Sequence, residues 1–200
     1  MRHVFCACLA MLALSMAPVA IAERTDELED PVEAVWLAQR LMFQYHSEGR
    51  MYRCDVLEYK ITRILAQFGA RDRIVVHGVA CRDFAGVVQL EVLMESPVIA
   101  TEENIRAITD YDSEDELIAR LNGVTLPSAE NIERFPAAWK SITLLRAPKI
   151  HLEAGDCALV QQLRRQILPK MSVQIVKDIE RADCTQASPR LTVRALVAKL

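Results

Sequence analysis

The sequence lacks the short motifs that mark the common enzyme classes. It has no GxSxG nucleophile elbow, P-loop, Rossmann glycine pattern or HExxH motif, and its six glycines are scattered. It also has no CxxC pair, whereas redox proteins and zinc sites typically use closely spaced cysteines. We therefore expect no cofactor or metal and name no catalytic, cofactor-binding or metal-ligating residue.

Only one long apolar run is present, and it lies at the N-terminus. A cationic start precedes the apolar stretch 4–14, Pro18 breaks its helix, and small side chains follow at Ala20 and Ala22. The run is shorter than the roughly 20 apolar residues that span a bilayer. The pattern predicts a secretory signal peptide over residues 1–22, cleaved after its last residue.

A strong charge imbalance is missing as well. Cleavage would leave 23 basic and 27 acidic side chains, which gives no reason to expect nucleic acid as a partner. The remaining chain has no second apolar run long enough to span a membrane. We expect an exported soluble envelope protein, either periplasmic or secreted.

Four cysteines remain after Cys6 and Cys8 leave with the signal peptide, and their spacing repeats. The spacing is 27 residues from Cys54 to Cys81 and again 27 residues from Cys157 to Cys184, and the two pairs are 103 residues apart. The only two tryptophans, at positions 36 and 139, have the same offset of 103. An offset that aligns six residues of rare types predicts an internal duplication.

Apolar patterns recur at the same offset and predict a strand, a helix and two strands in each copy. The predicted first strands are about 37–45 and 140–146, and the next are 74–80 and 173–179. The helices carry apolar stripes at helical spacing, comprising Leu57, Ile61, Ile64, Leu65 and Phe68 in one copy and Val160, Leu163, Ile167, Leu168 and Met171 in the other. The last strands alternate, with Val88, Leu90, Val92 and Met94 in one copy and Leu191, Val193, Ala195 and Val197 in the other.

The predicted fold class is α+β, with two βαββ units joined by a helical connector. Whether the units share one continuous sheet or form two lobes stays open at this point. The predicted order is a signal peptide (1–22), an acidic N-terminal stretch (23–33), repeat unit 1 (34–94), an acidic helical connector (95–135) and repeat unit 2 (136–200).

This order allows a geometric prediction of the disulfides. A helix of about 15 residues rises roughly 22 Å, and a returning strand of about eight residues covers roughly 26 Å. Each strand would therefore end where its helix began, within the roughly 4.4–6.8 Å between Cα atoms that a disulfide needs. We predict one disulfide in each unit, pairing Cys54 with Cys81 and Cys157 with Cys184.

Histidines and acidic pairs offer little support for chemistry. His46, His77 and His151 share no common motif, and each lies in or beside an apolar strand pattern. The acidic pairs of the connector stand where helices begin, and carboxylates are favourable at that end of a helix. We predict one connector helix from Ser113 to about 122, with Glu116 as capping-box partner, and a shorter helix from about Thr101.

Charge is unevenly distributed between the predicted segments. The acidic stretch 23–33 and the connector together carry a net charge of −12, which leaves +8 on the repeats. The basic side chains of the second repeat suggest a surface for an anionic ligand, comprising Arg164, Arg165, Lys170, Lys177, Arg181, Arg190 and Arg194. The simpler alternative, which we favour from the sequence, is that the acidic connector packs on its own basic repeats.

Two classes of function remain. The first is a non-catalytic interaction protein whose partner is an envelope protein or an anionic cell-wall polymer, which agrees with duplication and with the absence of catalytic motifs. The second is an exported hydrolase with a site between the repeats. Polar side chains converging in a deep cleft would favour the hydrolase.

Overall fold

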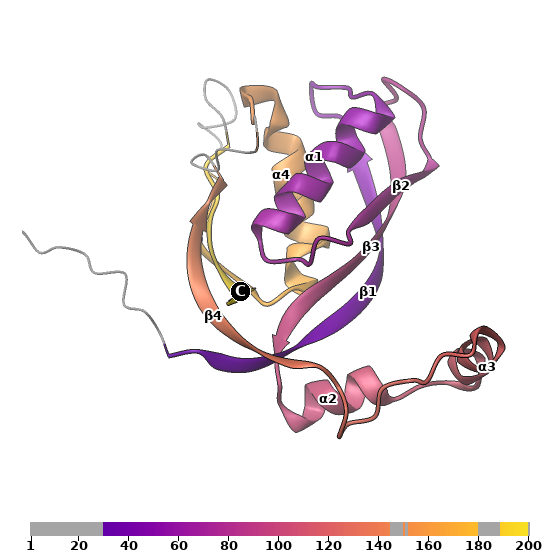
Figure 1. The fold of residues 1–200 in the computed structure, drawn as a ribbon. Helices are drawn as coiled ribbons and strands as arrows, with labels where there is room; N and C mark the ends of the chain where they lie inside the picture. Colours follow the sequence, from indigo (N-terminus) through magenta and orange to yellow (C-terminus); the bar gives the residue numbers. More distant parts are fainter. Residues whose placement is uncertain (1–29, 145–149, 151, 180–188, 200) are drawn as a thin grey trace, which may run out of the picture.

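The computed structural model describes residues 30–144, 150, 152–179 and 189–199. They form an α+β fold in which helices pack against a strongly curved antiparallel sheet (Figure 1). No helix within these residues is long and apolar enough to cross a membrane.

The elements follow one another in the order that the sequence predicts. They are β1 (Val32–His46), α1 (Cys54–Gln67), β2 (Val75–Ala80), β3 (Val87–Ile99), α2 (Glu102–Thr109), α3 (Ser113–Asn122), β4 (Arg134–Thr143), the short 3-10 helix η2 (Ala154–Asp156), α4 (Cys157–Gln166), a second 3-10 helix η3 (Leu168–Lys170), β5 (Val173–Lys177) and β6 (Thr192–Ala198). The strands form one six-stranded sheet in the order β2-β3-β1-β4-β6-β5. One continuous sheet thus replaces the alternative of two lobes.

The two halves of the sheet meet over a short stretch only. β1 pairs with β3 from Ala34 to His46, but it pairs with β4 only from Val32 to Val35. Beyond this join the strands diverge, and α1 and α4 lie in the concave space between them (Figure 1).

Both apolar helix stripes are buried as predicted. Each of their ten side chains is at most 7% exposed, and together with the sheet they form one core that draws on both halves. The alternating residues of β3 point into the same core. Full burial of an aliphatic side chain stabilises a protein by about 1.5–3 kcal/mol, so this core is the main source of stability.

The offset of 103 residues does not extend through the first strands. Leu90 and Val193 lie 103 residues apart and are both buried. Their neighbours across the sheet are Phe43 and Ile142, which are 99 residues apart. The sequence predicts the offset of 103 residues for the first strands as well, and this prediction is wrong in β1 and β4.

The two tryptophans consequently occupy different places. Trp36 lies opposite Pro97 in β3, whereas Trp139 lies opposite Leu196 in β6. A slip of four residues keeps every side chain on the same face of a strand, so the apolar pattern alone does not detect it.

The disulfide between Cys54 and Cys81 is present as predicted. Cys54 is the first residue of α1 and Cys81 directly follows β2, with their Cα atoms 6.0 Å apart. For the second predicted pair, Cys184 lies outside the described residues, so the pairing of Cys157 with Cys184 stays a prediction.

Replacing both cysteines of this disulfide, Cys54→Ser with Cys81→Ser, is expected to lower the free energy of unfolding by about 3–4 kcal/mol, because the bridge restrains the unfolded chain. Urea denaturation measures the change. Met51→Ser, an exposed neighbour, is the matched control. An unchanged urea midpoint in the double variant would show that the disulfide does not stabilise the fold.

Both connector helices begin within one residue of the predicted positions. Thr101 caps α2, its hydroxyl oxygen accepting a hydrogen bond from the Asn104 amide at 3.2 Å. α3 has a capping box, but Asp112 and Asp115 form it in place of Ser113 and Glu116. Asp is at least as good a cap as Ser, and its charge is favourable at this end of a helix.

Candidate functional site

The open edge of β1 is covered by glutamine side chains of α4. Gln162 accepts a hydrogen bond from the His46 amide at 2.8 Å and donates one to the His46 carbonyl at 2.7 Å. Gln166 likewise accepts a hydrogen bond from the Gln44 amide at 2.9 Å and donates one to the Gln44 carbonyl at 2.8 Å. Four helical residues rise roughly 6 Å and two strand residues roughly 7 Å, so the two amides match alternate positions of the strand. They take the place of a neighbouring strand.

Gln166→Glu is expected to lower the free energy of unfolding by about 1–3 kcal/mol, since a carboxylate cannot donate a hydrogen bond to the Gln44 carbonyl. Urea denaturation at neutral pH measures the loss. Gln174→Glu, on the exposed face of β5, makes the same chemical change without such contacts and is expected to have little effect. Equal effects of both substitutions would contradict the role given to Gln166.

A polar cluster joins the two halves at the N-terminal end of α4. Its centre is the fully buried carboxylate of Asp156. Lys60 of α1 lies 2.6 Å from this carboxylate, the Tyr52 hydroxyl donates a hydrogen bond to it, and the Glu153 amide donates another at 2.8 Å. Arg50 lies 3.8 Å away and also pairs with Glu153.

The tyrosines of this cluster are held in their neutral form. Burial, together with the hydrogen bond to Asp156, raises the pKa of Tyr52 far above its usual value. Burial also raises the pKa of Tyr45 to about 12, and its hydroxyl donates to the Arg50 carbonyl at 2.6 Å. Both hydroxyls therefore remain hydrogen-bond donors at neutral pH.

The cluster meets only part of the expectation for a hydrolase. Polar side chains from both halves do converge, but Asp156 is completely buried and its hydrogen bonds are made within the protein. In the described part of the chain, no group of three or more His, Cys, Asp or Glu side chains is placed to hold a metal ion. The cluster is best explained as a buried network that holds α1 and α4 together.

Tyr52→Phe is expected to lower the free energy of unfolding by about 1–3 kcal/mol at neutral pH, because Asp156 loses a donor. In the unfolded chain a tyrosine ionises near pH 10, whereas folded Tyr52 stays protonated. The free energy of unfolding of the wild-type protein therefore falls as the pH rises above about 10. The gap in this free energy between the wild-type protein and the Tyr52→Phe variant narrows over the same range. Urea denaturation at pH 7 and above pH 10 measures this. The same free-energy gap at both pH values would contradict the role given to Tyr52. The control is Tyr59→Phe, which alters an exposed tyrosine.

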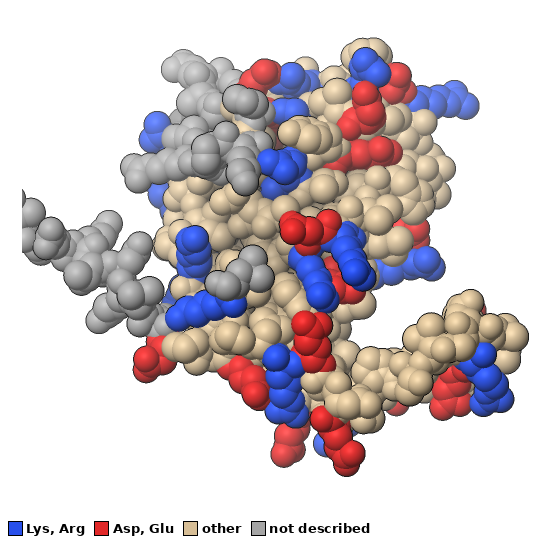
Figure 2. Space-filling model, viewed as in Figure 1, with Lys and Arg blue, Asp and Glu red and all other residues tan. Residues whose placement is uncertain are grey.

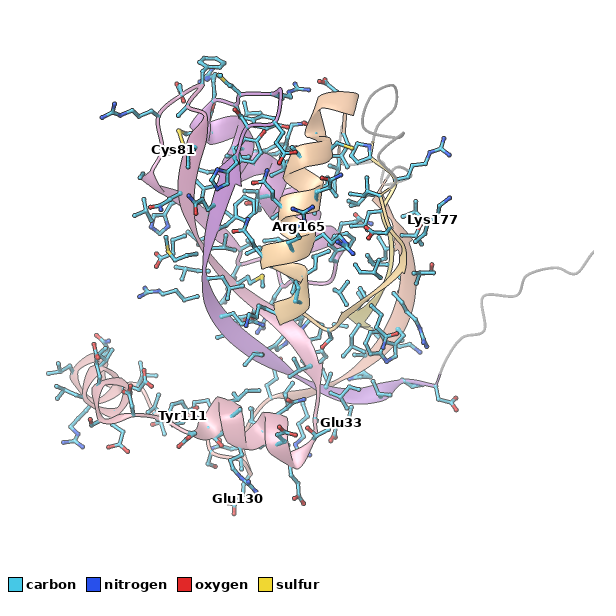
Figure 3. The ribbon with its side chains drawn as sticks, turned by 180° about the vertical axis from the view of Figure 1, so that it is seen from behind. Glu33, Cys81, Tyr111, Glu130, Arg165 and Lys177 are labelled. Carbon is cyan, nitrogen blue, oxygen red and sulfur yellow. A yellow bond between two sulfur atoms is a disulfide. The ribbon has the colours of Figure 1, made fainter. Side chains whose placement is uncertain are left out.

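The basic residues singled out from the sequence spread over α4, η3, β5, β6 and the loop before β6. Arg164 pairs with Asp178 at 2.5 Å, and Arg194 lies with its guanidinium carbon 5.5 Å from the centre of the Trp139 ring. Arg165 and Lys177 lie on different elements, the first on α4 and the second on β5 (Figure 3). Lys170 and Arg190 are exposed, and Arg181 lies outside the described residues.

Histidines occupy strand positions, as expected. His46 ends β1 and His77 lies in β2, with its Nε2 atom 3.2 Å from a Glu91 carboxylate oxygen on β3. His151 lies outside the described residues.

The segment from Ala100 to Glu133, here called the arm, separates β3 from β4. Its first helix, α2, is anchored by Ile105, which is 8% exposed. Its second helix, α3, stands away from the sheet and its helices in both ribbon views (Figures 1 and 3). The prediction that the acidic connector packs on its own basic repeats is therefore wrong for α3.

The apolar side of α3 is left uncovered by the residues that the structure describes. Leu117, Ile118 and Leu121 are 52%, 49% and 76% exposed, and Val124, which follows the helix, is 60% exposed. Figure 2 shows uncharged atoms over much of this end of the arm, with charged side chains along its lower rim. An apolar helix face normally lies against a core, so this face is unusual.

A hollow of about 520 Å³ lies at the base of the arm and is here called the basal groove. Trp36 and Phe135 line it, with their ring centres 4.4 Å apart. Arg71 lies over Trp36 at 5.2 Å and pairs with Glu95 at 3.2 Å and with Glu133 at 3.6 Å. The groove thus combines aromatic and charged side chains.

The backbone of the groove and its free cations complete the site. Gly69 has a positive φ of 95°, and a Cβ atom there would lie 2.6 Å from the Leu196 carbonyl oxygen. Only glycine therefore fits without movement of the backbone. Arg73 and Lys199 also line the groove, and neither has an acidic partner among the residues that the structure describes.

Sequence reasoning did not find the parts of this site. In the sequence, Trp36 stands out only by its offset from Trp139, and the charge of the connector does not reveal that α3 lies apart from the sheet. The strongest available signal was the spacing of Leu117, Ile118 and Leu121, which places apolar side chains on one helix face.

Comparisons with protein-family models, with curated proteins and with solved structures find no match for this chain. Its class is therefore defined by the fold, an α+β protein with a six-stranded antiparallel sheet and a disulfide.

Proposed function

We propose that this chain is an exported, non-catalytic interaction protein that binds a protein partner through the apolar face of α3. The observation that carries this proposal is the exposure of Leu117, Ile118 and Leu121. Their helix stands away from the rest of the described chain outside the arm, here called the body (Figure 1). Amphipathic helices commonly bind by laying such a face into a groove of the partner.

The length of α3 supports the need for a partner. The helix has ten residues, and isolated helices shorter than about 12–15 residues are marginal in water. Its capping box at Asp112 and its left-handed Gly123 favour the helix locally, but packing supplies most helix stability in proteins. A partner that buries the apolar face would supply this packing.

Export is part of the proposal. It is supported by the signal-peptide pattern over residues 1–22 and by the Cys54–Cys81 disulfide, because disulfides persist in oxidising compartments. We propose a periplasmic or secreted location on these grounds.

We also propose that the two halves arose by duplication of a βαββ unit. The same order of elements in both halves supports this. The strand order supports it too, because each half has its second strand at the edge, its third strand next and its first strand at the centre of the sheet. A further similarity is a break in register within each outer strand, at 78–80 in β2 and at 175–177 in β5. The tryptophan match no longer contributes, because the two residues are not equivalent in the sheet.

The other partners and activities have less support. For an anionic polymer, the basic residues of the second half are spread over several elements, and Arg164 is already paired. For a hydrolase, the carboxylate of Asp156, on which the polar side chains converge, is completely buried. The exposed face of α3 favours a protein partner over both.

A photo-crosslinking amino acid at position 121, introduced in the native envelope, is expected to give a protein adduct that a Leu117→Asp substitution in the same chain abolishes. Gel electrophoresis and mass spectrometry of the adduct measure this. The same crosslinker at position 59, which is exposed on α1, is the matched control. No adduct at position 121, or equal adducts at both positions, would contradict the proposal.

A further inference from the structure

We propose that the partner of α3 is a second copy of this chain, and that two copies exchange arms so that each α3 lies in the basal groove of the other. This inference rests on the proposed function of α3. It adds the identity of the partner and the surface that receives the helix.

Charge complementarity is the first support. The arm, from Ala100 to Glu133, carries nine acidic and two basic side chains, whereas the rest of the described chain carries 12 acidic and 17 basic ones. The acidic arm and the basic body attract each other, yet α3 stands away from its own body. A second copy supplies the same basic body to the arm of the first.

The chemistry of the basal groove matches that of α3. The groove offers Trp36 and Phe135 to an apolar face, and its volume of about 520 Å³ is in the range of sites that enclose a ligand group. Arg73 and Lys199 line the same groove, and within the described ranges neither has an acidic partner. On α3, acidic side chains at positions 114–116 lie in the same helix as the exposed leucines.

Other charges at the groove do not oppose this contact. Glu133 is paired with Arg71. Asp72 also lines the groove, so the lining carries two negative charges, on Asp72 and Glu133, and three positive charges, on Arg71, Arg73 and Lys199. An incoming acidic helix therefore meets a lining whose net charge is +1.

The position of the groove suits an exchange of arms. Glu133 and Phe135 line the groove and lie where the arm rejoins the sheet. Two arms that leave from beside the two grooves can cross with two-fold symmetry, which closes the assembly at a dimer. Each dimer then contains two identical contacts, and the second forms at high effective concentration.

Sedimentation equilibrium of the purified oxidised protein tests the exchange. We expect a reversible dimer, and we expect Leu121→Asp and Arg73→Glu each to weaken dimerisation at least about tenfold. Tyr59→Asp replaces a side chain of similar exposure on α1 and is expected to leave the dimer unchanged. Unchanged thermal unfolding of the two monomeric variants shows that they remain folded.

Mixing the two variants tests whether arm and groove meet. The Leu121→Asp protein keeps an intact groove and the Arg73→Glu protein keeps an intact arm, so their mixture retains one good contact per heterodimer. We expect the mixture to associate more strongly than either variant alone. A mixture no stronger than its components would overturn the exchange.

The remaining outcomes separate this inference from the proposed function. If the wild-type protein is monomeric at every concentration while the crosslinker at position 121 still captures a different protein, the exchange is overturned and the proposed function stands. If the protein is monomeric and position 121 captures nothing, both are overturned.

Discussion

The fold depends on how the backbone N–H and C=O groups of β1 are hydrogen-bonded beyond Val35, where β4 no longer pairs with this strand. The two strands share only the pairs from Val32 to Val35, and unpaired backbone groups at a buried edge are costly. Gln162 and Gln166 remove this cost by hydrogen bonding to Gln44 and His46. The sheet thus opens around α4 while the backbone groups of Gln44 and His46 stay hydrogen-bonded.

The same arrangement separates a well-packed body from an exposed arm. Apolar residues of α1, α4 and the strands meet in one core, and the network around Asp156 joins the helices of the two halves. Within the described residues, the apolar side chains of α3 pack on no such core. Their exposure, and the opposite charges of the arm and the rest of the described chain, are the two features on which the proposed contact with another molecule rests.

Local sequence patterns predicted the helices and strands. Features that depend on contacts between distant residues, namely the register of β4 and the position of α3, were not predicted. The stripes of α1 and α4 and the Cys54–Cys81 disulfide followed from periodicity and spacing, which depend on nearby residues. The register of β4 did not, because a slip of four residues leaves the buried face unchanged. Nor did the position of α3, because an acidic amphipathic segment has the same pattern whether it packs on its own body or on another molecule.

Hydrogen–deuterium exchange at several protein concentrations tests most directly whether contact with a second copy of the chain stabilises α3. The account predicts that amides of residues 113–122 exchange fast in dilute protein and become protected as the concentration rises. Amides of α1, Gln44 and His46 are predicted to be protected at every concentration, since their partners lie within the chain. Strong protection of α3 that does not change with concentration would contradict the account.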